Sequence, residues 1–193
     1  TDAVMVKLKN LDLVTKALDN AGVFYSVYDG IGGEPTDVMI EKGLDLYKEE
    51  GCNFLIALGG GSPIDSMKAI AALAVNGGKM SDYMGKEIAG AIPPMVAIPT
   101  TAGTGSEVTV ATVITDGDTH FKFPISDFPL IPDAAVLYAD LTRTLPKSLT
   151  ATTGMDALTH AVEAFIGRSC VKSSREDAIK AVKLIVENIE VAY

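Results

Sequence analysis

"LIALGGGSPIDSMKAIA", residues 55–71, passes from an apolar run through three glycines into a helical pattern. The apolar run has the length of a buried parallel strand. After the glycines, Ser62 is the predicted N-cap, Pro63 the first helical residue, and Asp65 the acid three positions after the cap. The order of strand, glycine turn and helix is typical of the beginning of a βαβ unit.

The glycine triplet at residues 59–61 also predicts a binding function. Glycines before a helix let backbone N–H groups approach a phosphate, and the helix N-terminus adds positive potential. The spacing is not G-x-G-x-x-G, so the usual dinucleotide fingerprint is absent. A tight turn followed by a capped helix is the structural alternative, and capping alone would explain Asp65.

Short apolar runs alternate with helical patterns through the first 150 residues. This alternation predicts an α/β fold with a doubly wound, Rossmann-like parallel sheet. A hairpin is expected to interrupt it around a turn at residues 116–118. The expected strands are residues 23–29, 54–58, 95–99 and 134–140, and the expected helices are residues 36–50 and 63–75.

The pattern changes after Pro146, where no further strand is expected. A helical face predicted for the last segment is formed by Ala178, Val182, Ile185 and Ile189. We therefore expect a dinucleotide-binding α/β domain at residues 1–147 and the beginning of a helical domain at residues 148–193. Two or three helices are too few for an independent helical domain.

Composition restricts the possible partners. The 193 residues include 25 Asp and Glu against 16 Lys and Arg, a formal net charge of −9, without the basic clusters that nucleic-acid binding needs. The longest apolar runs are too short to cross a bilayer, and no signal peptide is visible. Cys52 and Cys170 lack CxxC spacing, which indicates packing residues in a reducing compartment. We expect a cytoplasmic protein that binds a small molecule, with neither a nucleic acid nor a membrane as partner.

A second candidate loop is "AIPTTAGTGSE", residues 97–107. It places the hydroxyls of Thr100 and Thr101 at the end of a predicted strand, followed by Gly103 and Gly105. Hydroxyls and bare backbone at the carboxyl end of a strand suit ligand contact at the crevice of an open sheet. An ordinary turn is the alternative, although it would need fewer glycines.

A candidate metal site lies in "GMDALTHAVEAFI", residues 154–166. Asp156 and His160 are four positions apart in a helical pattern, so both side chains lie on one face and can converge on one cation. Such a cation needs more than two protein ligands. The only other histidine, His120, falls in a polar turn, which leaves the source of the remaining ligands open.

With "GGGSPID", "AIPTTAGTGSE" and "TGMDALTHAVEAF" in this order, the chain resembles the iron-containing (group III) alcohol dehydrogenases. The resemblance implies an NAD(P)-binding α/β domain, a helical metal-binding domain and hydride transfer in the cleft between them. It also implies a small primary alcohol, diol or aldehyde as substrate and a homo-oligomeric parent protein. The family's metal is held by one Asp and three His, of which Asp156 and His160 correspond to the first two. The resemblance implies that the other two His lie in the later helical region, beyond Tyr193. By this comparison the strand before Thr1 and most of the helical domain are missing.

The resemblance also implies the contacts to the cofactor. Asp2 corresponds to the residue that binds the adenosine ribose hydroxyls, which favours NAD over NADP. The remaining predicted contacts are Gly60, Gly61 and Ser62 at the pyrophosphate, Thr100 and Thr101 on the nicotinamide side, and Thr109, Lys122, Leu141 and Leu145 completing the pocket. Asp65 is a further predicted cofactor contact. One His and one carboxylate suit Fe(II) and Zn(II) equally, and the resemblance favours iron. Two departures from the family pattern are Glu34, where many members have Asn, and the loop around Asp127.

Two alternative functions remain open from the sequence. One is a metal- and NAD-dependent lyase of the dehydroquinate-synthase type, which would require basic residues for a phosphorylated substrate. The other is a nucleotide-binding module without catalysis. Covalent catalysis has little support, because no nucleophilic Ser or Cys with a neighbouring base is visible.

Overall fold

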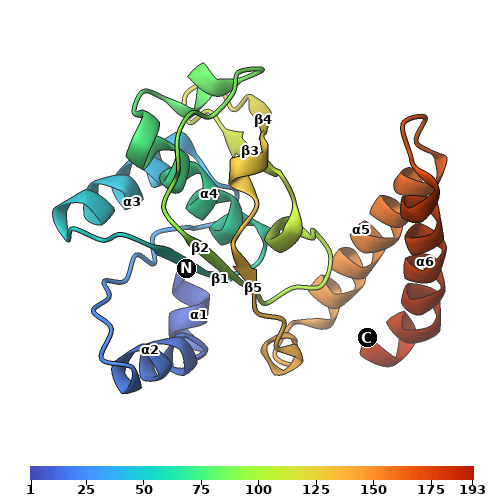
Figure 1. Cartoon of the computed structure of the whole chain (residues 1–193). Coiled ribbons are helices and arrows are strands. Elements are labelled where there is room, and N and C mark those ends of the chain that lie inside the picture. The colour runs from blue at the N-terminus through green and yellow to red at the C-terminus, as the bar shows by residue number, and fades with distance from the viewer. The chain divides into compact units, whose positions relative to one another are not determined.

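The computed structural model describes residues 1–193, which form two compact units (Figure 1). The first unit contains residues 1–100 and 106–138, and the second contains residues 101–105 and 139–193. The first unit is α/β and the second is helical. The boundary expected near residue 147 stays a prediction.

The first unit contains four α-helices, five short strands and three 3₁₀ helices. In chain order they are α1 (Ala3–Lys7), α2 (Leu11–Asn20), α3 (Asp37–Glu49), β1 (Leu55–Gly59), α4 (Gly61–Asn76), η1 (Met80–Tyr83), β2 (Met95–Pro99), η2 (Ser106–Val108), β3 (Ala111–Thr115), β4 (Lys122–Ser126), η3 (Phe128–Leu130) and β5 (Ala134–Ala135).

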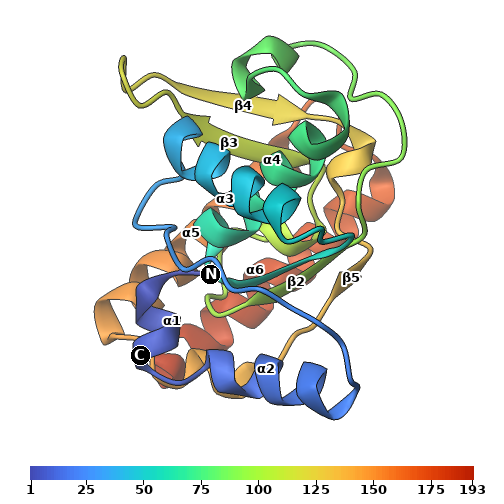
Figure 2. The ribbon, with the colours of Figure 1, turned by 90° about the vertical axis from the view of Figure 1, so that its left-hand side faces the viewer.

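A parallel sheet in the order β1-β2-β5 forms the centre of this unit (Figure 2). Leu55 lies opposite Met95 and Gly59 opposite Pro99, so β1 and β2 end at the same level. Only two residue pairs join β2 to β5, beginning with Val96 opposite Ala134. The predicted α/β class is confirmed, and so are the strands predicted at 54–58 and 95–99.

The strand predicted at residues 23–29 is wrong, because the connection from α2 to α3 contains no strand (Figures 1 and 2). A strand needs a partner, and no strand pairs with residues 23–29. Thr1 forms hydrogen bonds both with this segment and with β1. Its amino group donates a hydrogen bond to the Tyr28 carbonyl at 3.0 Å, and its hydroxyl donates to the Leu58 carbonyl at 2.7 Å. The strand predicted at 134–140 is also too long. Only residues 134–135 pair, at an exposed edge, and residues 139–142 form a 3₁₀ helix.

Helix α4 is the central element of the first unit. Ten of its residues are buried, because the sheet, α3 and the hairpin all pack around it. One apolar cluster joins α4 to α3 and the hairpin through Leu73, Ile40 and Ile114. A second cluster joins Met67 of α4 to Ala97 of β2. Apolar residues on most sides of a helix are typical of such a buried position, and the polar exceptions among the buried residues of α4 are Ser66 and Lys68.

The predicted hairpin is confirmed. Strands β3 and β4 pair antiparallel from Ala111–Ser126 to Thr115–Lys122. In the turn, the Asp116 carboxylate accepts hydrogen bonds from the N–H groups of Asp118 and Thr119 at 3.1 and 2.7 Å. The Thr119 hydroxyl donates a further hydrogen bond at 2.7 Å, and this bond, together with the two from N–H groups, lowers the pKa of Asp116.

The second unit contains the 3₁₀ helix η4 (Ala139–Thr142) and the long helices α5 (Lys147–Ile166) and α6 (Lys172–Ala192). The ammonium of Lys147, at the start of α5, lies 4.9 Å from the ring centre of Tyr193, which follows α6, so the two helices are antiparallel. The predicted face of α6 is confirmed, with Ala178 buried and Val182, Ile185 and Ile189 partly buried. Neither α5 nor α6 is apolar enough to cross a membrane.

Candidate functional site

The glycine turn follows β1 without an intervening loop. Gly59 ends the strand with φ +152°, and a Cβ at this position would stand 2.5 Å from Cγ of Pro63. A side chain is therefore excluded where the strand turns into the helix. The predicted N-cap at Ser62 is wrong, because Gly60 precedes the helix and Ser62 is its second residue. The helix begins earlier because the pairing of β1 with β2 ends at Gly59 and the glycines permit an immediate turn.

The N-terminus of α4 has no side-chain cap, which leaves the N–H groups of its first turn without a side-chain acceptor. Asp65, the predicted capping acid, instead forms hydrogen bonds with residues of η2 and the hairpin. A helix of 16 residues with an uncapped N-terminus, directly after a glycine turn, has the backbone chemistry of a phosphate site. The turn therefore fits the pyrophosphate of a dinucleotide.

Asp2 lies beside this turn. One of its carboxylate oxygens accepts hydrogen bonds from the N–H groups of Val4 and Met5 at 2.8 and 2.9 Å, which caps α1. The other oxygen, Oδ2, lies 3.4 Å from the position of a Cβ built on Gly59. Neighbouring Thr1 is tied to β1, and burial lowers the pKa of its amino group. Asp2 thus lies close to Gly59 at the end of β1, and its predicted contact with the ribose stays a prediction.

The second predicted loop is divided between the two units. Thr100 belongs to the first unit, where it is buried and donates its N–H to the Gly59 carbonyl at 2.9 Å. Thr101 begins the segment 101–105, which belongs to the second unit. Within that unit a Cβ on Gly103 would stand 2.6 Å from the carbonyl oxygen of Thr153. The loop thus needs this glycine to pack against α5.

A polar cluster that the sequence analysis missed lies on α4. Lys68 is fully buried, and its ammonium donates hydrogen bonds to the Thr109 carbonyl, the Thr109 hydroxyl and the Ala111 carbonyl at 2.9, 3.1 and 2.7 Å. Burial lowers the pKa of Lys68 to about 8 and raises that of Asp65. The available signal was a single lysine inside the apolar segment "MKAIAALAV", residues 67–75.

Two further predicted contacts, Thr109 and Lys122, already have partners within the first unit. Thr109 is partly buried and accepts from Lys68. Lys122 is exposed and forms an ion pair with Glu34, the residue that departs from the family pattern. The Asp127 loop is held by hydrogen bonds from the N–H groups of Ile88 and Phe128 at 2.6 and 2.7 Å.

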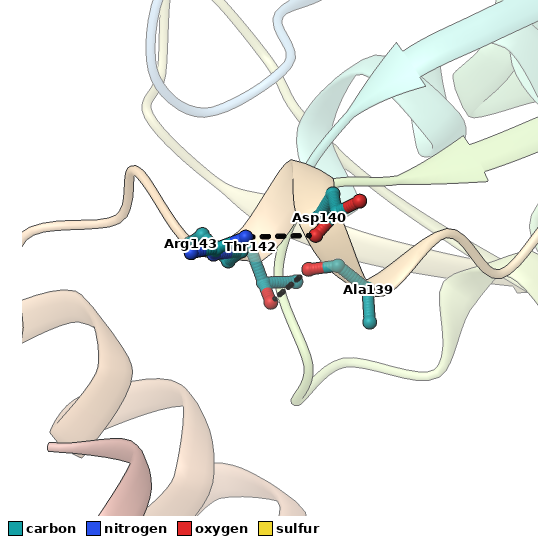
Figure 3. Close-up of polar contacts among 4 residues, drawn as sticks. All are labelled: Ala139, Asp140, Thr142 and Arg143. Carbon is teal, nitrogen blue, oxygen red and sulfur yellow. Dashed lines mark hydrogen bonds and ion pairs between the residues drawn. The ribbon is translucent and has the colours of Figure 1, made fainter.

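Leu141 and Leu145 lie in the second unit, in and after η4. Figure 3 shows how this turn is held: the Thr142 hydroxyl donates to the Ala139 carbonyl at 2.7 Å, and Arg143 lies 3.4 Å from the Asp140 carboxylate. Leu141 is buried, and Leu145 is partly buried. The turn is therefore an ordered element.

The predicted metal ligands on α5 converge as expected from their spacing. Oδ1 of Asp156 lies 3.6 Å from Nε2 of His160, and the two side chains are 45 and 59 % exposed. An anionic oxygen and an imidazole nitrogen on one accessible face fit a divalent cation. No group of three or more His, Cys, Asp or Glu side chains in the chain is arranged to hold a metal. His120 adopts φ +57° in the hairpin turn of the other unit.

The first unit also contains an apolar cavity of about 370 Å³. It lies among α2, residues 23–28, β1, α3 and α4. Its lining includes the apolar residues Leu18, Phe24 and Leu55. Ser66 also lines the cavity, and its buried hydroxyl has no hydrogen-bond partner. None of the predicted cofactor contacts lines the cavity, although Leu58 and Pro63, which adjoin the glycine turn, do.

Comparison with known families identifies the class of protein. The family described as "Iron-containing alcohol dehydrogenase" matches residues 1–139, and the family described as "Fe-containing alcohol dehydrogenase family, C-terminal" matches residues 150–193. The chain belongs to the iron-containing alcohol dehydrogenase family, and the resemblance inferred from the three motifs is confirmed.

Individual relatives agree with this assignment. The chain is 39 % identical over 188 residues to the NAD-dependent methanol dehydrogenase of Bacillus methanolicus, a match that covers 97 % of this chain and 49 % of that enzyme. A crystal structure of 1,3-propanediol oxidoreductase matches with a TM-score of 0.95 and 37 % identity, over 99 % of this chain and 50 % of that one. Sulfoacetaldehyde reductase from Bifidobacterium kashiwanohense in complex with NAD+ matches with a TM-score of 0.90 and 31 % identity, over 99 and 51 % of the two chains. The chain thus spans about half the length of these relatives.

Proposed function

We propose that this protein is a metal-dependent alcohol dehydrogenase or aldehyde reductase, which transfers hydride between NAD and a small primary alcohol or diol. The observation that carries the proposal is the glycine turn, with the uncapped N-terminus of α4 on one side and the Asp2 carboxylate on the other. Family membership and the names of the relatives support the reaction class.

Three groups of residues would hold the dinucleotide. Backbone N–H groups of Gly60, Gly61 and Ser62 would bind the pyrophosphate, because no side chain competes for them. Asp2 would accept hydrogen bonds from the ribose hydroxyls and would repel the 2′-phosphate of NADP. Thr100 and Thr101 remain predicted contacts on the nicotinamide side, and Thr109, Lys122, Leu141 and Leu145 remain predicted contacts in the rest of the pocket. Asp65 remains a predicted contact, although both of its carboxylate oxygens already have partners within the chain.

Asp156 and His160 would supply two ligands to Fe(II), with Zn(II) as the alternative metal. A bound divalent cation supplies Lewis acidity, which favours the alkoxide form of an alcohol and polarises an aldehyde carbonyl. The two residues hold their donor atoms 3.6 Å apart on an accessible face, which supports this role. For the 193-residue chain itself we propose cofactor binding without turnover, because only these two ligands converge.

The organisation expected from the sequence forms part of the proposal. We assign the dinucleotide-binding domain to residues 1–147 and the beginning of the metal-binding domain to residues 148–193. We also propose a cytoplasmic, homo-oligomeric parent protein with a small alcohol or aldehyde as partner. The two cysteines are free, which supports a reducing compartment.

One experiment tests the proposed function. The 193-residue chain and a full-length relative, such as 1,3-propanediol oxidoreductase, are assayed side by side with Fe(II), NAD and 1,2- or 1,3-diols. We expect both proteins to bind NADH in a fluorescence titration and only the relative to reduce NAD. A chain that binds no dinucleotide would contradict the proposal.

A further inference from the structure

The Lys68 ammonium is buried without a carboxylate as hydrogen-bond partner. Its three hydrogens are all directed to neutral oxygen atoms, two on Thr109 and one on Ala111. Asp65 and Glu107 are the charged groups near enough to raise its pKa, yet burial outweighs both. Because an apolar side chain of similar volume would avoid the cost of desolvation, stability alone does not account for a lysine at this position.

Asp65, one turn earlier on α4, binds the same segment of chain. Its carboxylate accepts hydrogen bonds from the Ser106 hydroxyl and from the Val113 N–H, the latter at 2.9 Å. Its backbone carbonyl accepts from the Thr112 hydroxyl at 2.9 Å. Together with Lys68, one turn of α4 therefore holds residues 106–113 along most of their length. This is the helix whose N-terminus follows the glycine turn.

The hydrogen bond from Lys68 also determines that the Thr109 hydroxyl acts as a donor toward any further partner. Because this oxygen accepts a hydrogen from the ammonium, its own hydrogen must go to another acceptor. The acceptor within the chain is the Ser106 carbonyl at 3.4 Å, which is longer than an ordinary O–H···O bond. A hydroxyl polarised by an ammonium is also a better donor. Thr109 is partly buried, so a ligand oxygen can replace the weak internal acceptor.

We propose that Asp65 and Lys68 are positioning residues, which fix residues 106–113 on α4 so that the Thr109 hydroxyl donates a hydrogen bond to an oxygen of the bound dinucleotide. This inference rests on the proposed function. Lys68 thus makes the Thr109 hydroxyl a hydrogen-bond donor toward the ligand without contacting the ligand itself.

The test uses the 193-residue chain at pH 7.0 and three changes: Lys68→Met, Thr109→Val and the double change. Titration calorimetry measures the affinities for NAD and ADP-ribose. Each single change should weaken NAD binding about tenfold, the equivalent of one hydrogen bond. The double variant should be no weaker than the single ones, because Lys68 acts through Thr109. Thr109→Ser should recover most of the affinity.

ADP-ribose locates the acceptor oxygen. If affinity for ADP-ribose is retained, the oxygen belongs to the nicotinamide half, and if it falls in parallel, the oxygen lies on the ADP-ribose part. Amide hydrogen exchange in residues 106–113 provides a readout that needs no ligand, and Lys68→Met should accelerate it. Ser66→Ala is the matched control, because Ser66 is buried on the same helix and its hydroxyl has no partner. It should change neither exchange nor affinity.

The measurements distinguish a failure of the positioning role from a failure of the proposed function. If NAD affinity is unchanged in Lys68→Met while exchange accelerates, the cluster is only structural and the positioning role is refuted. Additive losses in the double variant would likewise refute action through Thr109. A wild-type chain that binds neither ligand would overturn the proposed function and the positioning role together. Should Lys68→Met fail to fold by circular dichroism, Thr109→Val decides the question with the lysine in place.

Discussion

Oδ1 of Asp156 and Nε2 of His160 lie 3.6 Å apart on one face of α5, and no third ligand joins them. A catalytic metal site normally has three or more protein ligands before water and substrate occupy the open positions. As the metal ligands proposed above, Asp156 and His160 are too few to hold a cation tightly, and this number of ligands leads to the first prediction.

We predict that the chain does not retain stoichiometric metal. After loading with Fe(II) or Zn(II) and dialysis against a weak chelator, elemental analysis should find far less than one metal per chain, because each missing ligand removes affinity. His160→Ala should abolish the remaining weak binding, whereas the control His120→Ala should leave it unchanged. About one tightly held metal per wild-type chain would show that the ligands are complete within residues 1–193.

A second prediction concerns Asp2 and the choice of cofactor. Asp2→Asn should retain the cap of α1, since asparagine caps a helix as well as aspartate does, while removing the charge beside Gly59. The preference for NADH over NADPH should fall about tenfold or more in fluorescence titrations. The unfolding temperature should hardly change. An unaltered preference in this variant would show that Asp2 does not contact the ribose.

The pH dependence of the free energy of unfolding should reveal the lowered pKa of Lys68. Its pKa falls from the model-compound value of 10.5 to about 8 on folding, so between these values the unfolded chain binds more protons than the folded chain. Stability must then rise with pH across this window, by up to about 3 kcal/mol in total. Asp65 and Glu107 oppose the shift and limit the gain.

Urea unfolding between pH 7.5 and 9.5 measures this effect as the difference between the wild-type chain and Lys68→Met. The subtraction removes the contribution of Cys52, whose pKa is raised by burial and whose titration acts in the opposite direction. A difference that stays constant with pH would mean that Lys68 titrates as it does in water.

Gly103 should be intolerant of a side chain for a packing reason. A Cβ there would stand 2.6 Å from the Thr153 carbonyl oxygen, and a backbone atom cannot easily give way. Gly103→Ala should therefore reduce the free energy of unfolding by about 1–3 kcal/mol. Gly32→Ala is the control, because nothing lies within 4 Å of its Cβ position. Equal stability of the two variants in urea unfolding would contradict the packing described for segment 101–105.

Local sequence patterns predicted those helices, strands and turns whose ends are marked by glycines or polar turn residues. The run that became β1, the helix that became α4 and the turn at residues 116–118 were all recognised, because glycines and polar turn residues delimit them. Residues 23–29 misled the prediction, since their apolar composition says nothing about whether a partner strand lies beside them. Pairing is a tertiary property.

The dependence on tertiary contacts also explains which parts of the candidate site could be predicted from the sequence. Asp156 and His160 could be paired from their spacing, because both belong to one helix. The contacts of Asp65 and Lys68 join residues 41 to 48 positions apart, and no local period reveals them. The predicted cap at Ser62 failed because the acid that fitted the capping pattern forms its bonds with η2 and the hairpin.

The most direct test of the central claim is the affinity for NAD of Gly61→Val, measured by titration calorimetry beside the wild-type chain. Gly61 is the first residue of α4, where backbone must approach phosphate and a branched Cβ would stand in the way. Gly32→Val serves as the control. We expect at least a tenfold loss of affinity in Gly61→Val alone, with far-UV circular dichroism unchanged. Undiminished binding by a folded Gly61→Val chain would contradict this expectation and leave the glycine turn with a structural role only.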